Sequence, residues 1–271
     1  MLSLKARTLF SPPFSFALSL PKRIPHLRPS FSLKTYSQSS PSKSPVKMSS
    51  SQTVVEHVVL VKVKENTDLS KVNTMVSRLN SLSSLDQVLH LTVGPVLRSG
   101  SSSLNFTHAL HSRYRTKDDL AAYSAHPTHL SVVKESLLPI IDDIMAVDWV
   151  ATGGDVDDFF VPPPGSAIRF TFLKLKENLG DTVKSEILGV IKEIKGNFSQ
   201  IKQISCGENF SPARAKGFSL ASLAIFPEVS EMEAVDSNEE WVNSQKEKVR
   251  DYLEGVVVVD YVIPQPQSAS L

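Results

Sequence analysis

The 271-residue sequence holds a single cysteine, Cys206, and no long hydrophobic run. One cysteine excludes a disulfide within the chain and a thiolate metal cluster, which is typical of a reducing compartment. We expect Cys206 to be a small apolar strand residue. The apolar stretch at 14–20 is far shorter than the about 20 residues that a membrane-spanning helix needs, so a membrane is not an expected partner.

Acidic residues are missing from the first 47 positions, which carry eight basic residues and many serines and prolines. This composition is typical of an organelle transit peptide, so we expect 1–47 to be a disordered leader outside the fold. The remaining 21 basic and 28 acidic residues give 48–271 a net charge of −7. Because a net negative charge does not attract phosphates, nucleic acid is not an expected partner either.

The two ends of the chain resemble targeting signals for two different organelles. The leader predicts import into the chloroplast, and Ala269-Ser270-Leu271 resembles the SKL signal for peroxisomes, with Ser where a basic residue is preferred. Translation from Met48 would give a chain without the leader and with the same C-terminus. We therefore expect a peroxisomal location, a chloroplast location or both.

What the sequence does contain is internal repetition. Val-Lys-Val-Lys-Glu-Asn at 61–66 returns as Leu-Lys-Leu-Lys-Glu-Asn at 173–178, and Asp-Trp-Val at 148–150 returns as Asp-Tyr-Val at 260–262. Both offsets are 112 residues. A constant offset from the first strand to the last indicates two duplicated units of similar size and layout.

The repeat divides the chain into domains. A further match, Gly94 with Gly207, is offset by one more residue, as a loop insertion would produce. Glycines and a proline run between the copies are typical of a linker. We predict a first domain at 54–152, a linker at 153–165, a second domain at 166–263 and a flexible tail at 264–271.

Each unit reads as strand, helix, strand, strand, helix, strand. The first unit is predicted to have strands at 54–63, near 87–93, at 104–114 and at 144–150, with a helical region at 117–138 that Pro127 interrupts. Asp68 can cap the first helix, and an apolar stripe follows at Leu69, Val72, Met75, Val76, Leu79 and Leu82. The second unit repeats this with a stripe at Val183, Ile187, Val190, Ile191 and Ile194 and a last strand at 256–263.

The layout predicts an α+β fold. One sheet with two helices leaves one sheet face apolar and open, and two such units can bury those faces against each other. Because both units lie in one chain, we expect an intramolecular pseudo-dimeric barrel. Pairing between two chains, as a homodimer, stays open.

Polar residues of the first unit are the candidate site. Strand alternation places His57 on one face with Val55 and Val59, and His108 on one face with Phe106, Leu110 and Tyr114. Buried imidazoles either find a hydrogen-bond partner or line a pocket, and a partnered core histidine is the commoner case. Further along, Tyr123, His126 and His129 are spaced by three. Zinc binding by His126 and His129 lacks a third ligand in the pattern.

These motifs together resemble a known family. The opening at 57–64, the Phe-Thr-His at 106–108 and the Tyr-x-x-His-Pro-x-His at 123–129 are similar to the stress-responsive A/B barrel family, Dabb. The resemblance covers essentially 54–263 and implies a dimeric α+β barrel of ferredoxin-like halves. The family includes plant stress-induced proteins without assigned chemistry and cyclases that close a poly-β-keto chain into an aromatic ring.

The resemblance also implies roles for residues. In the cyclase branch Tyr123 and His129 would be the catalytic acid/base pair, with ligand binding by His57, His108 and His126. The second unit has Arg169, Leu220, Val235 and Trp241 at the positions equivalent to His57, His108, Tyr123 and His129, so at most one such pocket is expected per chain. Some members hold Mg²⁺ on main-chain carbonyls where the first helix ends, here near Asn80 and Ser83, although these residues can equally be terminating the helix.

Three functions are compatible with these observations. A non-enzymatic role in stress protection or ligand binding, with a small hydrophobic or phenolic ligand and no required cofactor, is the first. A cyclase-like enzyme using Tyr123 and His129 is the second, and an assembly scaffold is the third. A hollow pocket beside these residues would favour the first two, and a filled barrel interior the third.

Overall fold

The computed structural model describes residues 53–100, 104–151 and 161–265. The chain divides into a unit of residues 1–48 and a compact unit of residues 49–271, which holds both repeats. The predicted leader, Met48, the linker up to residue 160 and the C-terminal signal lie outside the described residues. No described helix is long and apolar enough to cross a membrane.

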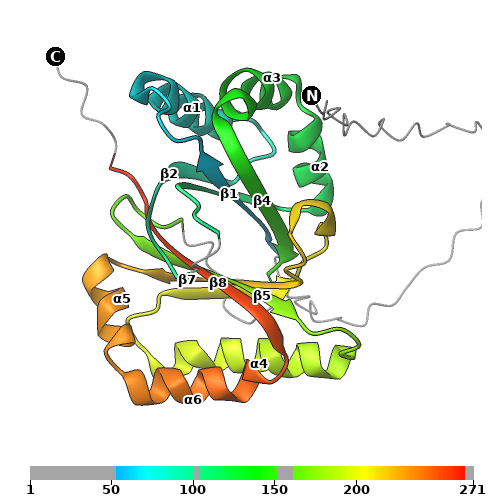
Figure 1. Cartoon of the computed structure of the whole chain (residues 1–271), viewed down its shortest axis with the longest axis vertical. Helices are drawn as coiled ribbons and strands as arrows, with labels where there is room; N and C mark the ends of the chain where they lie inside the picture. Colours follow the sequence, from blue (N-terminus) through cyan, green and yellow to red (C-terminus); the bar gives the residue numbers. More distant parts are fainter. Residues whose placement is uncertain (1–52, 101–103, 152–160, 266–271) are drawn as a thin grey trace, which may run out of the picture. The chain divides into compact units, whose positions relative to one another are not determined.

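The first repeat follows the predicted order of elements (Figure 1). Asp68 caps its first helix by accepting from the Ser70 N–H at 2.7 Å, and Pro127 begins a new helix because proline fits the first helical position. The elements are β1 (Val55–Val63), α1 (Leu69–Ser81), η1 (Leu82–Ser84), β2 (His90–Ser99), β3 (His108–Tyr114), α2 (Lys117–Ala125), α3 (Pro127–Val132), the π-helical turn η2 (Val133–Leu137), η3 (Leu138–Ile140) and β4 (Ile141–Val150).

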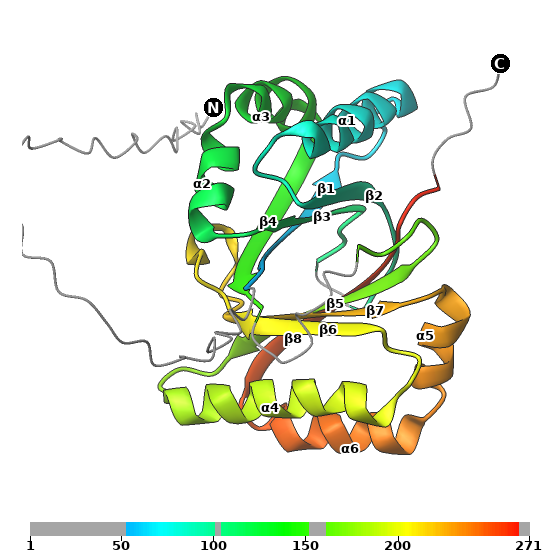
Figure 2. The ribbon, with the colours of Figure 1, turned by 180° about the vertical axis from the view of Figure 1, so that it is seen from behind.

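The second repeat has the same order with a longer first helix. Its elements are β5 (Ala167–Leu175), α4 (Asp181–Asn197), β6 (Gln203–Glu208), η4 (Pro212–Arg214), β7 (Leu220–Phe226), α5 (Val229–Asp236), α6 (Glu239–Arg250) and β8 (Leu253–Val262). Helices α1 to α3 cover the outer face of one half of the barrel, and α4 to α6 cover the outer face of the other (Figures 1 and 2).

The described strands form one antiparallel sheet in the order β4-β1-β3-β2-β8-β5-β7-β6. The two repeats join where β2 pairs with β8. The outer strands β4 and β6 approach each other as well, because Trp149 bridges to Asn209 and the Phe210 N–H donates to the Asp148 carbonyl at 2.9 Å. The sheet therefore curls into a barrel with one repeat on each side, which is the predicted intramolecular pseudo-dimer.

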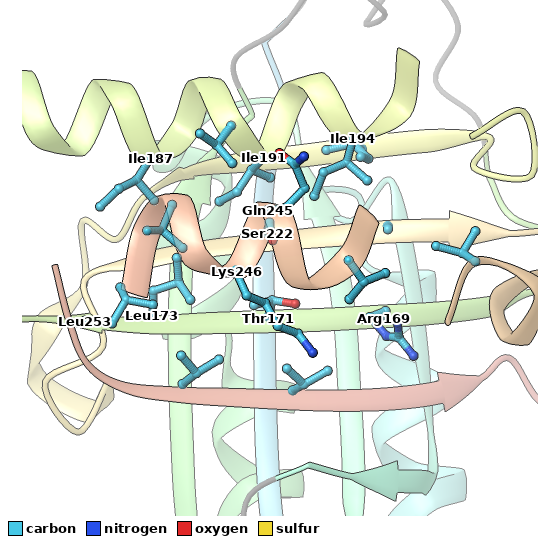
Figure 3. A pocket seen from close by; sticks show the side chains of 18 of the residues that line it. Arg169, Thr171, Leu173, Ile187, Ile191, Ile194, Ser222, Gln245, Lys246 and Leu253 are labelled. Atoms are coloured by element: carbon cyan, nitrogen blue, oxygen red, sulfur yellow. The ribbon is translucent and has the colours of Figure 1, made fainter. Parts of the chain in front are cut away.

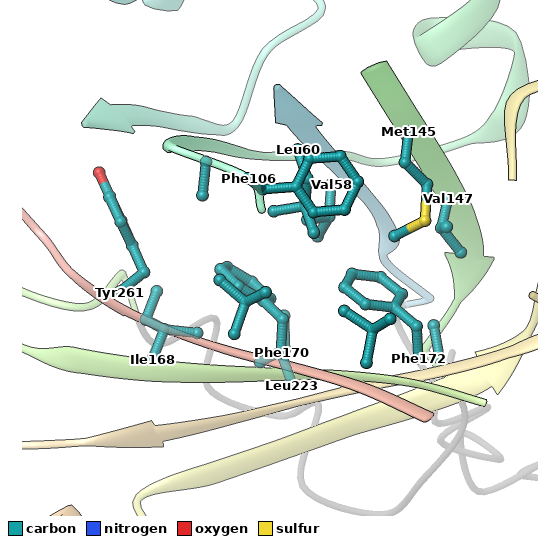
Figure 4. Packing of buried hydrophobic residues seen from close by; sticks show 14 of the residues in the cluster. Val58, Leu60, Phe106, Met145, Val147, Ile168, Phe170, Phe172, Leu223 and Tyr261 are labelled. Carbon is teal, nitrogen blue, oxygen red and sulfur yellow. The ribbon is translucent and has the colours of Figure 1, made fainter. Parts of the chain in front are cut away.

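Side chains fill the barrel interior. Aromatic and aliphatic residues from both repeats point toward one another between the two halves of the sheet (Figure 4), among them the fully buried Val58, Leu60, Met145, Phe170, Phe172 and Tyr261. Removing this apolar surface from water is the main force that holds the repeats together. The helix-covered faces therefore offer more room for a ligand than the interior between the two halves of the sheet.

A charged cluster is also buried between the repeats. Glu56 accepts from the Arg113 Nε at 3.0 Å and contacts the His111 Nε2 at 2.7 Å, and Arg113 donates to the Gln203 side chain of the other repeat at 2.8 Å. Burial raises the pKa of Glu56, but Arg113 and His111 outweigh burial and lower it to about 2. Glu56 therefore stays charged at neutral pH, and Arg113 connects its cluster to the other repeat.

The repeated sequence motifs have structural reasons. Asn66 and Asn178, which end the repeated strand motif, both adopt positive φ, of 60° and 64°, a conformation that asparagine tolerates better than most residues. Gly94 leaves room for the ring of Tyr261, since an added Cβ would lie 3.3 Å from that ring. Gly207 does the same for Trp149, whose ring would lie 3.1 Å from the added Cβ.

Two residues lie elsewhere than the sequence pattern predicts. Leu69 is 77% exposed, because it lies at the first position of α1, where the helix has not yet reached the sheet. Phe106 packs in the barrel interior and not beside Leu110, because it precedes β3 and strand alternation does not extend to it.

Candidate functional site

In the first repeat, strand pairing brings His57 of β1 opposite Asp148 of β4. The His57 Nδ1 lies 2.5 Å from the Asp148 Oδ1, and the two side chains are mostly buried. Burial raises the pKa of Asp148, but the hydrogen bond to His57 and its charge outweigh burial and lower that pKa. Asp148 therefore orients the imidazole and remains a carboxylate at neutral pH.

A line of aromatic rings leads from His57 to His129. Ring centroids are 6.3 Å apart for His57 and Tyr114, 5.2 Å for Tyr114 and Tyr123, and 4.6 Å for Tyr123 and His129. These residues come from β1, β3, α2 and α3, on the helix-covered face of the sheet. The structure thus brings together three of the predicted site residues, with Tyr114 connecting them.

The hydrogen bonds of this cluster set its protonation. The His129 Nδ1 lies 3.0 Å from the Ser124 carbonyl, which can only accept, so Nδ1 carries the proton and Nε2 is the free base. Burial is the main cause that lowers the pKa of His129, and burial raises the pKa of Tyr123 to about 12. A neutral imidazole therefore lies beside a protonated phenol, a pair suited to general acid–base chemistry.

His108 and His126 have other surroundings. His108 pairs with Val61, four residues along β1 from His57, a separation of about 13 Å at the rise of a strand. Its Nδ1 lies 3.0 Å from the Thr107 hydroxyl, and burial lowers its pKa. His126 caps α3, where its Nδ1 accepts from the Thr128 N–H at 3.2 Å.

The predicted magnesium turn is held by hydrogen bonds within the chain. The Asn80 side chain donates to the Val93 carbonyl at 3.2 Å and accepts from the Val93 N–H at 3.1 Å, so it fastens α1 to β2. Within the described residues, no group of three or more His, Cys, Asp or Glu side chains could hold a metal ion. Main-chain ligation of Mg²⁺ near Asn80 and Ser83 stays a prediction.

The second repeat has an ion-pair cluster at the position of the His57–Asp148 pair. Arg169 donates to Asp260 at 2.8 Å and to Asp236 at 2.5 Å, and Arg98 of the first repeat donates to Asp236 at 2.9 Å and also to Asp260. Although burial opposes it, hydrogen bonds to both aspartates raise the pKa of Arg169. The arginines and aspartates therefore satisfy one another.

Beside this cluster, the second repeat contains a cavity of about 800 Å³. It lies between the sheet and helices α4 and α6 (Figure 3). We call it the second-repeat cavity. Helix α6, which is described throughout, has no fully buried residue. The lining is mainly apolar and includes Leu173, Ile187, Ile191, Ile194, Ile204, Val235 and Trp241.

Substitutions between the repeats explain the hollow. The paired strand residues Val59 and Leu110 of the first repeat have Thr171 and Ser222 as their equivalents. Val235 stands in place of the larger Tyr123. Because Ser222 and Val235 are smaller than Leu110 and Tyr123, they leave a space between the sheet and α6.

The motifs of the second repeat do not predict this cavity, because the histidines and the tyrosine of the first repeat are missing there. The usable signal was the replacement of Val59, Leu110 and Tyr123 by smaller or more polar residues at matched positions. The half-exposed state of Val190, Ile191 and Ile194, predicted as a core stripe, has the same cause, since they line the cavity.

Comparison with known proteins agrees with the fold and with the repeat. A sequence model of the family described as "Stress responsive A/B Barrel Domain" matches residues 55–151 and again 168–263. The chain is 50% identical over 275 residues to a stress-response A/B barrel domain-containing protein of Arabidopsis thaliana, with 100% of both chains covered. It is 47% identical over 213 residues to a second protein of the same description from that plant, covering 78% of this chain and 97% of the relative.

Among solved structures, an anthrone oxidase-like protein superposes with a TM-score of 0.55 at 12% identity, covering 81% of this chain and 94% of the other. At that identity the likeness concerns the fold alone. The two ranges that match the family model together cover most of the described residues, and the relatives share about half of their residues with this sequence. The chain therefore belongs to the stress-responsive A/B barrel family, with two family domains in tandem.

Proposed function

We propose that this protein is a non-enzymatic ligand-binding barrel, whose small apolar ligand occupies the second-repeat cavity. The observation that carries the proposal is the cavity itself, about 800 Å³ in size and lined mainly by apolar residues. Ligand sites in proteins are typically about 300–1,000 Å³, apolar, and supplied with a few polar groups. Because the barrel interior is filled, the helix-covered face is the better place for a ligand.

Energetics support the same assignment. Ile191 and Ile194 of α4 and Trp241 of α6 are only partly shielded from water by the protein itself. An apolar ligand would cover them and gain about 25 cal/mol for each Å² removed from water. Binding would also connect α6 to the sheet and so stabilise the second repeat.

A thermal-shift screen of the full chain tests the proposal. The compounds are fatty-acyl, phenolic and poly-β-keto molecules. The key variants are Ser222→Leu and Val235→Tyr, which restore the residues of the first repeat and fill the cavity. Ser185→Leu, on the exposed side of α4, is the matched control.

A ligand present at about 100 times its Kd adds about 2.7 kcal/mol to the stability of the folded state, so a clear rise in Tm is expected. The rise should persist in Ser185→Leu and disappear in both cavity-filling variants. If no compound raises the Tm of the wild type, or if the rise survives filling of the cavity, the proposal is wrong.

A second candidate function is acid–base catalysis in the first repeat, and one observation favours it. The Tyr123 and His129 ring centroids lie 4.6 Å apart, and the His129 Nε2 has no hydrogen bond to any residue that the structure describes. In an aldol ring closure, this nitrogen would remove a proton between two carbonyls, and the Tyr123 hydroxyl would donate to the enolate oxygen that forms. His57, held by Asp148, would position the substrate.

Catalysis is tested by ring closure of a poly-β-keto substrate. His129→Gln should lower the rate by about 10²–10⁴-fold if His129 is the base. His126→Gln is the control, because His126 caps α3 and its removal costs helix stability without removing the base. No ring closure by the wild type would reject the enzyme and leave the ligand-binding proposal as it stands.

The compartment is a separate proposal, a peroxisomal location, a chloroplast location or both, which rests on the terminal sequences. Fluorescent fusions that leave one terminus free at a time would test each address. Blocking the C-terminus should abolish peroxisomal signal, and starting at Met48 should abolish chloroplast signal.

A further inference from the structure

The acidic residues around the second-repeat cavity have basic partners. Asp236 accepts from Arg169, Glu247 from Arg250 at 3.0 Å and Glu254 from Lys174 at 2.6 Å. These carboxylates have their charges compensated by neighbouring cations. They therefore repel a second negative charge less than isolated carboxylates would.

Lys246 of α6 differs from these cations. It lines the cavity, yet among the described residues its ammonium group donates no hydrogen bond and forms no ion pair. It acts on Asp236 only at longer range, as a minor cause that lowers the pKa of that carboxyl. Figure 3 shows its side chain extending from α6 over the strands. Lys246 thus supplies the cavity with a positive charge that no described residue pairs with and with three N–H donors that no described residue accepts.

Two hydroxyl groups lie on the floor below. Thr171 of β5 and Ser222 of β7 are paired residues on neighbouring strands, and both line the cavity. Ser222 is 8% exposed, and neither hydroxyl has a hydrogen bond to another described residue. They can donate to an oxygen that enters between the sheet and α6.

We propose that the ligand is an amphipathic monocarboxylate, with its carboxylate held by Lys246, Thr171 and Ser222 and its aliphatic part among the isoleucines of α4. This inference rests on the proposed ligand-binding function and adds the chemical class. One cation and two hydroxyls match a single carboxylate charge, whereas a dianion would leave a negative charge near Asp236 uncompensated. Branched aliphatic side chains at Ile187, Ile191 and Ile194 suit a hydrocarbon chain.

Calorimetric titration of the full chain with decanoate and with decan-1-ol tests this at neutral pH, where decanoate is ionised. The two probes share a chain length and differ in the head group. The variants are Lys246→Met, which keeps the length of the side chain and removes its charge, and Lys192→Met on the exposed side of α4 as the matched control. Ser222→Leu, with its cavity filled, gives the non-specific baseline.

The wild type should bind decanoate about tenfold more tightly than decan-1-ol, as a charge-assisted hydrogen bond predicts. Lys246→Met should remove that difference, and Lys192→Met should keep it. Equal affinities for the two probes, or an unchanged preference in Lys246→Met, would overturn the monocarboxylate while ligand binding stands. Absence of specific binding by both probes overturns the monocarboxylate and counts against the cavity as an aliphatic site.

Discussion

Arg98 of β2 and Asp260 of β8 form an ion pair that joins the two repeats. Asp260 also accepts from Arg169 of its own repeat at 2.8 Å, and its side chain is 3% exposed. The equivalent aspartate of the first repeat, Asp148, pairs with one histidine only among the described residues. One duplicated position therefore has two roles, since Asp260 connects the repeats and Asp148 orients an imidazole.

This difference predicts that the same substitution, Asp to Asn, lowers the free energy of unfolding by different amounts at the two positions. Asp260→Asn removes the more deeply buried of the two carboxylates that Arg98 and Arg169 share, leaves them with Asp236 as their shared partner, and should destabilise the fold by about 3 kcal/mol. Asp148→Asn keeps a hydrogen-bonding group beside His57 and should cost about 1 kcal/mol. Urea unfolding of the two variants measures the difference. Equal losses of stability would show that Asp260 does not hold the repeats together.

The buried Glu56 predicts loss of stability in acid. Its pKa in the folded state is about 2, below its usual value of 4.5, so the unfolded chain binds a proton more readily than the folded protein. Stability from this group is therefore complete above about pH 5 and is lost as the pH falls toward about 2. The shift corresponds to about 3 kcal/mol. Unfolding free energies measured from neutral pH into this acid range should show the decline.

Glu56→Gln is the control for that acid effect. The variant should be less stable at neutral pH, because Arg113 and His111 lose their buried counter-charge. Its stability should also depend less on pH in acid, since the titrating group is gone. An unchanged acid dependence would assign the effect to other carboxylates, such as Asp148 or Asp236.

Much of the fold could be predicted because the chain repeats itself. The repeat indicated the unit size, the order of elements and the pseudo-dimer. Alternation placed His57 on one face with Val55 and Val59, and the structure shows that this is the helix-covered face. The sequence could not show that Asp148 pairs with His57, because the partners lie 91 residues apart. The motif containing Asp148 was recognised as a repeat, and its chemistry depended on strand pairing.

The candidate site was harder to predict, since sequence motifs identify individual residues and do not reveal cavities between them. Tyr123, His126 and His129 stood out by spacing, yet His126 became a helix cap while Tyr114 entered the cluster. The second-repeat cavity arises from side chains that became smaller, such as Val235. A loss of side-chain volume leaves no recognisable sequence motif. It opens a cavity only if α6 does not move inward to fill the space.

Gly207 predicts a sharp steric effect at the closure of the barrel. A Cβ at this position would lie 2.7 Å from the Val150 carbonyl oxygen of β4, a backbone atom that cannot rotate away. Gly207→Ala should therefore destabilise the protein by about 1–3 kcal/mol. Gly189→Ala in α4 is the control, because nothing lies within 4 Å of its added Cβ, and it should stabilise the helix by about 0.5–1 kcal/mol. Thermal unfolding should move the two Tm values in opposite directions.

His129 predicts a measurable tautomer and titration. Its Nδ1 faces the Ser124 carbonyl at 3.0 Å, so the proton should lie on Nδ1 in the neutral ring. Burial lowers the pKa of His129 below its usual 6.5, so the ring should stay neutral at neutral pH and gain its proton only in more acidic solution. Because the unfolded chain takes up that proton at higher pH, the folded state loses stability as the pH falls through about 6.5.

Imidazole ¹⁵N spectra of the histidine-labelled full chain would record both properties. The sequence has seven histidines, and the His129→Gln variant identifies the relevant signal by its disappearance. We expect an Nδ1-protonated ring with a midpoint below the usual 6.5. A midpoint at or above that value would leave much of His129 cationic near neutral pH, and an Nε2-protonated ring would place the lone pair toward a carbonyl. Either result would remove His129 as a general base and leave the second-repeat cavity as the better-supported functional site.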